Sequence, residues 1–178
     1  MAPADGLDRD DTAAVTWQLG RAPRGVVAVA HRCPCGEPDV VTTAPRLPDG
    51  TPFPTMYYLT CPLASAAVGT LESTGLMRDM EARLARDPEL STRYHAAHES
   101  YLAARAAIGT VAEVEGISAG GMPNRVKCLH VLAAHALAAG PTVNPLGDEA
   151  LAALPEWWRG GGCKSGRAAV QPSPEERS

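Results

Sequence analysis

The first third of the chain places short apolar runs between turns, a pattern typical of β-strands. Residues 25–33 (GVVAVAHRC) are apolar and rich in β-branched side chains, which predicts a strand. A turn over residues 34–39 leads to a second predicted strand that begins at Val40, and residues 56–60 (MYYLT) predict a third. Short strands that follow one another across turns pair most simply as a small antiparallel sheet.

Helical spacing replaces this pattern after the third strand. Apolar residues recur every three or four positions over residues 62–84, with a weak point at 73–75. The Asp87-Pro88 pair predicts a break, because proline cannot continue the preceding helix. The next predicted helix has the clearest apolar face of the chain, which consists of Leu90, Tyr94, Ala97, Tyr101, Ala104 and Ile108.

Three further helices complete the prediction. The first starts at Asp10 or Asp11 and ends at Gly20, the second runs from near Pro123 to Gly140, and the third is short, over residues 148–158. Neither residues 1–10 nor residues 160–178 show an apolar period, so both ends are predicted to be disordered. The sequence therefore predicts one α+β domain over residues 11–159, with a small antiparallel sheet near the N-terminus packed against three or four helices.

Composition narrows the choice of partners and compartment. The 178 residues carry a net charge of −4, so no overall positive field favours nucleic acid or an anionic membrane surface. No apolar run approaches the roughly 18–20 residues that cross a bilayer, and the acidic N-terminus does not look like a signal peptide. A cytoplasmic protein is expected, in which five cysteines are free thiols, metal ligands or catalytic groups rather than disulfides.

Four of these cysteines fall at predicted ends of elements. Cys33 and Cys35 stand where the first strand meets its turn (AHRCPCGEPDV), and Cys61 precedes a proline that suits a helix start. Cys128 falls in the first turn of the helix predicted from Pro123. The ends of elements are where a fold can bring distant ligands together. Cys163, in the predicted tail, is expected to be an incidental free thiol.

Thiolates are preferred ligands of zinc and of iron–sulfur clusters. We hypothesise that Cys33, Cys61 and Cys128 converge on one such centre, with Cys35 or His130 as the fourth ligand. Three protein ligands alone would leave an open position that suits an anionic substrate. Because the sequence contains no C-x-x-C pair, the burial of small thiols in an ordinary core remains the alternative.

The segment SAGGMPNRVKCLH has the features of an anion-binding turn. Gly120 and Gly121 allow the backbone to approach a ligand, and the predicted helix start supplies free N–H groups. Arg125 and Lys127 add positive charge, so a small anionic ligand such as a phosphate or carboxylate is expected to bind here. The alternative is a glycine turn with solvated bases, since the segment lacks the G-K-[ST] of a Walker loop.

The same segment supports a second chemical hypothesis. Cys128 would lie at a helix N-terminus beside Lys127 and close to His130, which is the environment of a reactive thiolate. A cysteine-dependent enzyme that uses Cys128 is therefore a further alternative. Glu72 and Arg105 lie in no motif and are predicted to be ordinary helix charges.

Four blocks of the sequence together resemble one protein family. They read RGVVAVAHRCPCGEPDVV, APRLPDGTPFPTMYYLTCP, AHESYLAAR and GGMPNRVKCLHVLAAHALAAGPTVNPLGDE. The resemblance covers about residues 12–158 and is to the actinobacterial domain of unknown function 501 (DUF501) family. It brings no established activity with it. It does place six candidate residues inside family motifs: Cys33, Cys61, Arg125, Lys127, Cys128 and His130.

The resemblance also suggests what kind of partner the protein has. Members of this family are typically small cytoplasmic proteins, often encoded near a septum-formation initiator protein and an exopolyphosphatase-like protein. It therefore implies a link to cell division or phosphate metabolism. A non-catalytic adaptor, docking such a partner through the helix over residues 90–108 or through Trp157 and Trp158, is the alternative to a metal-binding protein.

Overall fold

The sheet that the sequence predicts is present in the computed structural model, which describes residues 6–159 and Cys163. The strands β1 (Val26–Arg32), β2 (Pro38–Thr43) and β3 (Tyr57–Leu59) pair antiparallel in the order β1-β2-β3. The predicted disorder of residues 1–5, 160–162 and 164–178 lies outside the described residues.

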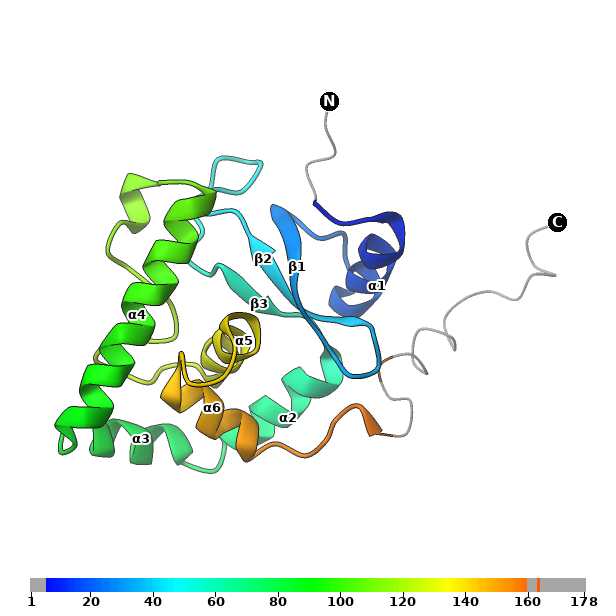
Figure 1. Cartoon of the computed structure of the whole chain (residues 1–178). Helices are drawn as coiled ribbons and strands as arrows, with labels where there is room; N and C mark the ends of the chain where they lie inside the picture. Colours follow the sequence, from blue (N-terminus) through cyan, green and yellow to red (C-terminus); the bar gives the residue numbers. More distant parts are fainter. Residues whose placement is uncertain (1–5, 160–162, 164–178) are drawn as a thin grey trace, which may run out of the picture.

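Helices account for most of the remaining described chain (Figure 1). They are α1 (Arg9–Leu19), α2 (Pro62–Glu72), α3 (Leu76–Leu84), α4 (Pro88–Ile108), α5 (Leu129–Ala139) and α6 (Pro145–Ala152), with a 3₁₀ turn, η1, at Ala112–Val114. The predicted α+β class is therefore confirmed. Among the described helices, none is long and apolar enough to span a membrane.

Local signals set most of the helix boundaries. Gly75 adopts a left-handed conformation and separates α2 from α3 at the predicted weak point. Asp87 caps α4 by accepting hydrogen bonds from two backbone N–H groups, those of Glu89 and Leu90. At the N-terminus the prediction was two or three residues late, because Asp8 and not Asp10 or Asp11 caps α1. Arg9 and Asp10, predicted to be disordered, therefore belong to the helix.

The two faces of the sheet bury different parts of the chain. Val41 of β2 packs with Val15 of α1 in a small apolar cluster, whereas its neighbour Val40 belongs to the main core on the other face. This alternation follows from the strand, whose successive side chains point to opposite faces. The sheet thus lies between α1 on one side and the remaining helices on the other (Figure 1).

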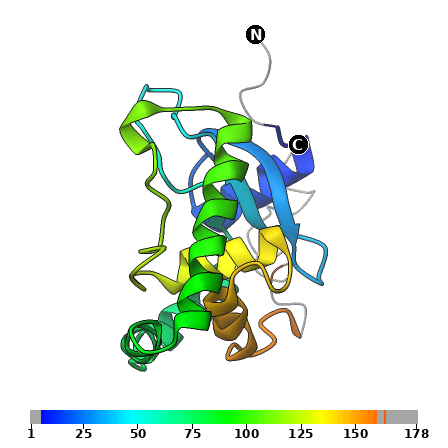
Figure 2. The same ribbon diagram turned by 60° about the vertical axis from the view of Figure 1, so that its left-hand side comes forward.

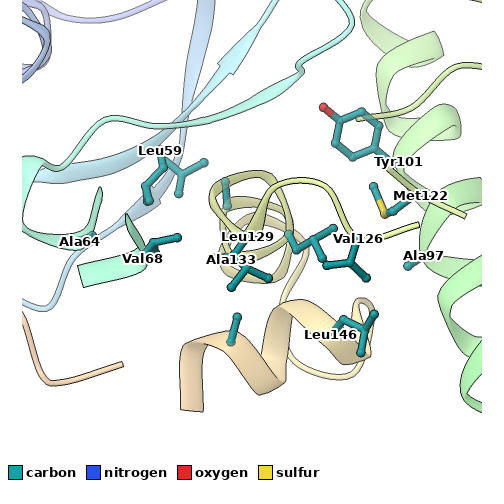
Figure 3. Packing of buried hydrophobic residues seen from close by; sticks show 14 of the residues in the cluster. Leu59, Ala64, Val68, Ala97, Tyr101, Met122, Val126, Leu129, Ala133 and Leu146 are labelled. Atoms are coloured by element: carbon teal, nitrogen blue, oxygen red, sulfur yellow. The ribbon is translucent and has the colours of Figure 1, made fainter. Parts of the chain in front are cut away.

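Helix α5 runs through the middle of the main core. Figure 1 shows it nearly end-on between the sheet, α2, α4 and α6, and Figure 2 shows it crossing behind α4. A helix that is apolar all round is stable only when it is buried on every side. Around it, Val68 of α2 and Leu146 of α6 lie close to Leu129 and Ala133 of α5 (Figure 3). Six residues of α5 are buried: Leu129, Leu132, Ala133, Ala134, His135 and Ala136.

The start of α5 differs from the prediction. The helix begins at Leu129, six residues after Pro123, which lies in a loop. In that loop the backbone N–H of Lys127 donates to the Gly120 carbonyl at 2.8 Å, a bond that folds the segment back on itself. Because this N–H does not bond four residues back, the helical hydrogen-bond ladder cannot begin at Pro123.

Arg105 also departs from the prediction of an ordinary helix charge. Only 5% of it is exposed, and no carboxylate pairs with it in the described ion pairs. Its guanidinium instead donates to three backbone carbonyls, those of Pro54 at 3.2 Å and of Val114 and Ile117 at 2.6 Å. The side chain therefore joins α4 to the loop before β3 and to the segment around η1.

Replacing Arg105 with methionine is expected to lower the free energy of unfolding by about 2–4 kcal/mol, because it leaves buried carbonyl oxygens without donors. Arg93→Met is the matched control, since Arg93 lies exposed on the same helix. Urea unfolding of both variants measures the difference. An equal, small effect of the two substitutions would contradict the structural role of Arg105.

Helices α5 and α6 cross at a glycine. A Cβ atom at Gly147 would lie 2.2 Å from the Leu132 carbonyl oxygen and 2.8 Å from the Ala136 Cβ. Both distances are well below the sum of the van der Waals radii. The contact with the Leu132 carbonyl is with helix backbone, which cannot shift without breaking helical hydrogen bonds. Gly147 is therefore what lets α6 approach the central helix so closely.

Replacing Gly147 in α6 and Gly69 in α2 with alanine should change the free energy of unfolding in opposite directions. Gly147→Ala is expected to destabilise the protein by about 2 kcal/mol or more, because the added methyl overpacks the crossing. Gly69→Ala, where a Cβ meets nothing within 4 Å, is expected to stabilise α2 by about 0.5–1 kcal/mol. Thermal and urea unfolding should show this reversal, and a gain in stability from Gly147→Ala would contradict the packing.

Candidate functional site

Four of the five cysteines gather at one end of the sheet. The sulfur of Cys163 lies 3.8 Å from the Cys33 sulfur and 3.3 Å from the Cys61 sulfur. The sulfur atoms of Cys33, Cys35 and Cys163 all lie within 4.8 Å of one another. All of these cysteines are free thiols, and Cys33, Cys35 and Cys163 form a cluster that could hold a metal ion. Cys61 adjoins this cluster through its contact with Cys163.

A tight turn between β1 and β2 supplies two of the sulfurs. The Gly36 N–H donates to the Cys33 carbonyl at 2.8 Å, and the Cys33 N–H donates to the Glu37 carbonyl at 3.0 Å. Gly36 has a φ of 92°, a left-handed conformation that side chains rarely adopt. The turn closes around Pro34 and brings Cys33 and Cys35 to the same point, as their predicted place at a strand end suggested.

Cys61 comes from the start of α2. It follows β3, serves as the N-cap residue of α2 and has no measurable exposure. Pro62 then occupies the first helical position, where its missing N–H costs nothing. Cys61 therefore lies at the positive end of the α2 helix dipole.

Cys163 is the member that the sequence reading missed. Cys163 is a free thiol, as expected, but it is not incidental, because it is 2% exposed and lies close to the sulfurs of Cys33 and Cys61. It follows Cys61 by 102 residues and sits in a glycine-rich segment with no apolar period. The only signal for it in the sequence was the residue type itself.

Burial dominates the electrostatics of the cluster. It raises the pKa of the Cys33 thiol to about 11, although a hydrogen bond from the Cys35 backbone N–H acts in the opposite direction. Burial also raises the pKa of Cys163. These two thiols are therefore neutral at pH 7 unless a cation replaces their protons.

Cys128 and His130 lie in a different place from the other predicted ligands. They group with Glu72, and one ligand atom of each lies within 4.8 Å of the others. Glu72 ends α2 whereas Cys61 caps its start, and 11 residues of helix span about 16 Å. The predicted single pocket for Cys33, Cys61 and Cys128 is corrected accordingly: the structure divides these residues between the two ends of α2.

Hydrogen bonds organise this second group. Glu72 Oε1 accepts from the Leu129 backbone N–H at 2.7 Å and lies 3.2 Å from His130 Nδ1. A hydrogen bond with Cys128 is the largest influence that raises the pKa of His130 to about 9, and Glu72 adds to it. Glu72, predicted to be an ordinary helix charge, therefore caps the N-terminus of α5 by accepting a hydrogen bond from its first N–H.

The residues of the predicted anion-binding turn lie together, but no helix begins at this turn. Gly120, Gly121, Arg125 and Lys127 line a surface hollow of about 410 Å³. The backbone N–H groups of Arg125 and Lys127 donate to the Gly121 and Gly120 carbonyls, so they do not point into the hollow as free donors. Anion binding by these residues stays a prediction, which now depends on the exposed side chains of Arg125 and Lys127.

Comparison with known proteins gives a family but no activity. No match was found among curated proteins, and none was found among solved structures. A family model described as "protein of unknown function (DUF501)" matches residues 29–152. Because this match covers well over half of the chain and includes the sheet, α2 and α5, the chain belongs to the DUF501 family.

Proposed function

We propose that this protein binds one metal ion through the four thiolates of Cys33, Cys35, Cys61 and Cys163. The observation that carries the proposal is the position of the Cys163 sulfur, 3.8 Å and 3.3 Å from the sulfurs of Cys33 and Cys61. These residues come from three segments that are distant in the chain. Four sulfurs gathered without a disulfide are the donor set of a structural thiolate site.

The spacing of the sulfurs favours a single ion. Zinc–sulfur bonds of about 2.3 Å in a tetrahedron put the ligand sulfurs roughly 3.8 Å apart, which is close to the distances from the Cys163 sulfur to those of Cys33 and Cys61. Cys61 lies outside the group of sulfurs that are all within 4.8 Å of one another, so its side chain would move inward to bind the same ion. An iron–sulfur cluster places several iron and sulfide atoms between its cysteines and so holds them further apart. Zinc, or a single iron in the same tetrahedron, is the ion that this arrangement suits best.

The surroundings can stabilise a negatively charged site. The Cys35 backbone N–H donates to the Cys33 sulfur, and Cys61 lies at the N-terminus of α2. Both arrangements place positive partial charge near these cysteines. Since burial keeps Cys33 and Cys163 protonated in the absence of a cation, ion binding would release protons and strengthen as pH rises.

The structure favours this function over the adaptor. The apolar face of α4, proposed as a docking surface, is turned into the core, where Tyr94, Ala97 and Tyr101 are fully buried. Trp157 and Trp158 pack against the same core. A partner in cell division or phosphate metabolism therefore stays a prediction.

Cobalt(II) provides the first test of the four-cysteine site. Full-length protein loaded with cobalt(II) should show strong sulfur-to-cobalt absorption, and Cys61→Ser combined with Cys163→Ser should remove most of it. Cys128→Ser is the matched control and should keep most of the signal, because Cys128 belongs to the other group. Equal signals from the double variant and the control would overturn the proposal.

Metal removal gives the second test. Dialysis against a chelator under reducing conditions should lower the free energy of unfolding by about 3 kcal/mol relative to protein with free zinc at a hundred times its dissociation constant. Adding zinc back should restore it in the wild type but not in the Cys61→Ser, Cys163→Ser variant. Unfolding curves that are unchanged by chelator and by zinc would contradict a bound structural ion.

A further inference from the structure

A second set of metal-binding atoms lies at the N-terminus of α5, away from the four cysteines. Glu72, Cys128 and His130 contribute a carboxylate, a thiol and an imidazole within 4.8 Å of one another. Glu72 is the last residue of α2, Cys128 is the N-cap residue of α5, and His130 is the second residue of α5. Sulfur, nitrogen and carboxylate oxygen together form a donor set typical of zinc.

The hydrogen bonds of His130 direct its Nδ1 at a carboxylate oxygen, a position that either a proton or a metal ion can occupy. Nε2 lies 3.1 Å from the Ser65 carbonyl oxygen, which can only accept, so Nε2 carries the proton of the neutral ring. Nδ1 then directs its lone pair at Glu72 Oε1, 3.2 Å away. Two lone pairs that face each other at this distance repel, unless a proton or a metal ion lies between or beside them.

His130 and Glu72 each make a hydrogen bond of the kind that orients metal ligands in proteins. A histidine that binds metal through one nitrogen usually donates the other N–H to a carbonyl or carboxylate, as His130 does to Ser65. The carboxylate of Glu72 is likewise held by the Leu129 backbone N–H at 2.7 Å. Both ligands are thus fixed in direction before any ion binds.

We propose that Glu72, Cys128 and His130 Nδ1 bind a second divalent ion of the zinc type, separate from the four-cysteine site. Three protein ligands leave one tetrahedral position for water or for a donor atom of a ligand. The side chains of Glu72 and His130 are 24% and 30% exposed, so this position is open to solvent. Such a site differs from the buried four-cysteine centre, where protein sulfurs fill every position.

Zinc stoichiometry tests the proposal on the full-length protein. Reduced protein is equilibrated with zinc(II), desalted and analysed for metal. The wild type should hold two ions per chain, and His130→Gln should lose one of them. His95→Gln, at an exposed position on α4, is the matched control and should keep both. Glu72→Gln keeps an acceptor for the Leu129 N–H and should lower the affinity for the second ion by about 10–100-fold.

A labelling experiment avoids dependence on any variant. Zinc should slow the alkylation of Cys128 by iodoacetamide in the wild type by about tenfold or more, measured on the Cys128 peptide by mass spectrometry. Unchanged labelling, together with equal zinc content in wild type and His130→Gln, would overturn the proposal and leave a proton as the only cation between His130 and Glu72.

The same data separate this proposal from the proposed function. Loss of one ion on Cys61→Ser, Cys163→Ser substitution tests only the four-cysteine site, and loss of one ion in His130→Gln tests only the second. A His130-dependent ion in a protein whose four cysteines bind nothing would uphold this inference and reject the other.

Discussion

The burial of α5 along most of its length is the constraint on which the rest of the structure depends. This helix has buried residues all around its surface, so the sheet, α2, α4 and α6 must all pack against it. Gly147 permits the close approach of α6, and Glu72 accepts from the first backbone N–H of α5. Because α2 packs beside α5 and begins just after β3, the same packing places Cys61 near the turn that carries Cys33.

Both candidate sites follow from this arrangement of α2. Its first end meets the β1–β2 turn and Cys163, and its last residue meets the start of α5. One helix thus separates a group of four thiols, of which all but Cys35 are buried, from a partly exposed group of mixed ligands. Burial suits the first group to a structural ion that excludes water, whereas the exposure of the second leaves room for an exchangeable ligand.

Local sequence signals predicted which elements occur but misplaced bounds of α1, α5 and α6, and they predicted the sites only in part. β-Branched runs marked the strands, and Asp87 with Pro88 marked the start of α4, because these preferences act within a few residues. The grouping of cysteines depends on contacts across 102 and 130 residues, which no local pattern reports. The sequence offered Cys33, Cys35 and Cys61 as candidate ligands, which the structure places near Cys163, a residue that the sequence did not offer. Cys128, predicted to join them, lies at the other end of α2. Arg105 was misjudged for the same reason, since its three carbonyl partners lie in other segments.

X-ray absorption at the zinc edge shows whether four cysteine sulfurs share one ion. The sample is full-length, zinc-loaded protein that carries His130→Gln, so that only the four-cysteine site is filled. The account predicts a single shell of four sulfur atoms at about 2.3 Å from zinc. A shell dominated by nitrogen or oxygen, or protein that retains no zinc after desalting, would contradict it.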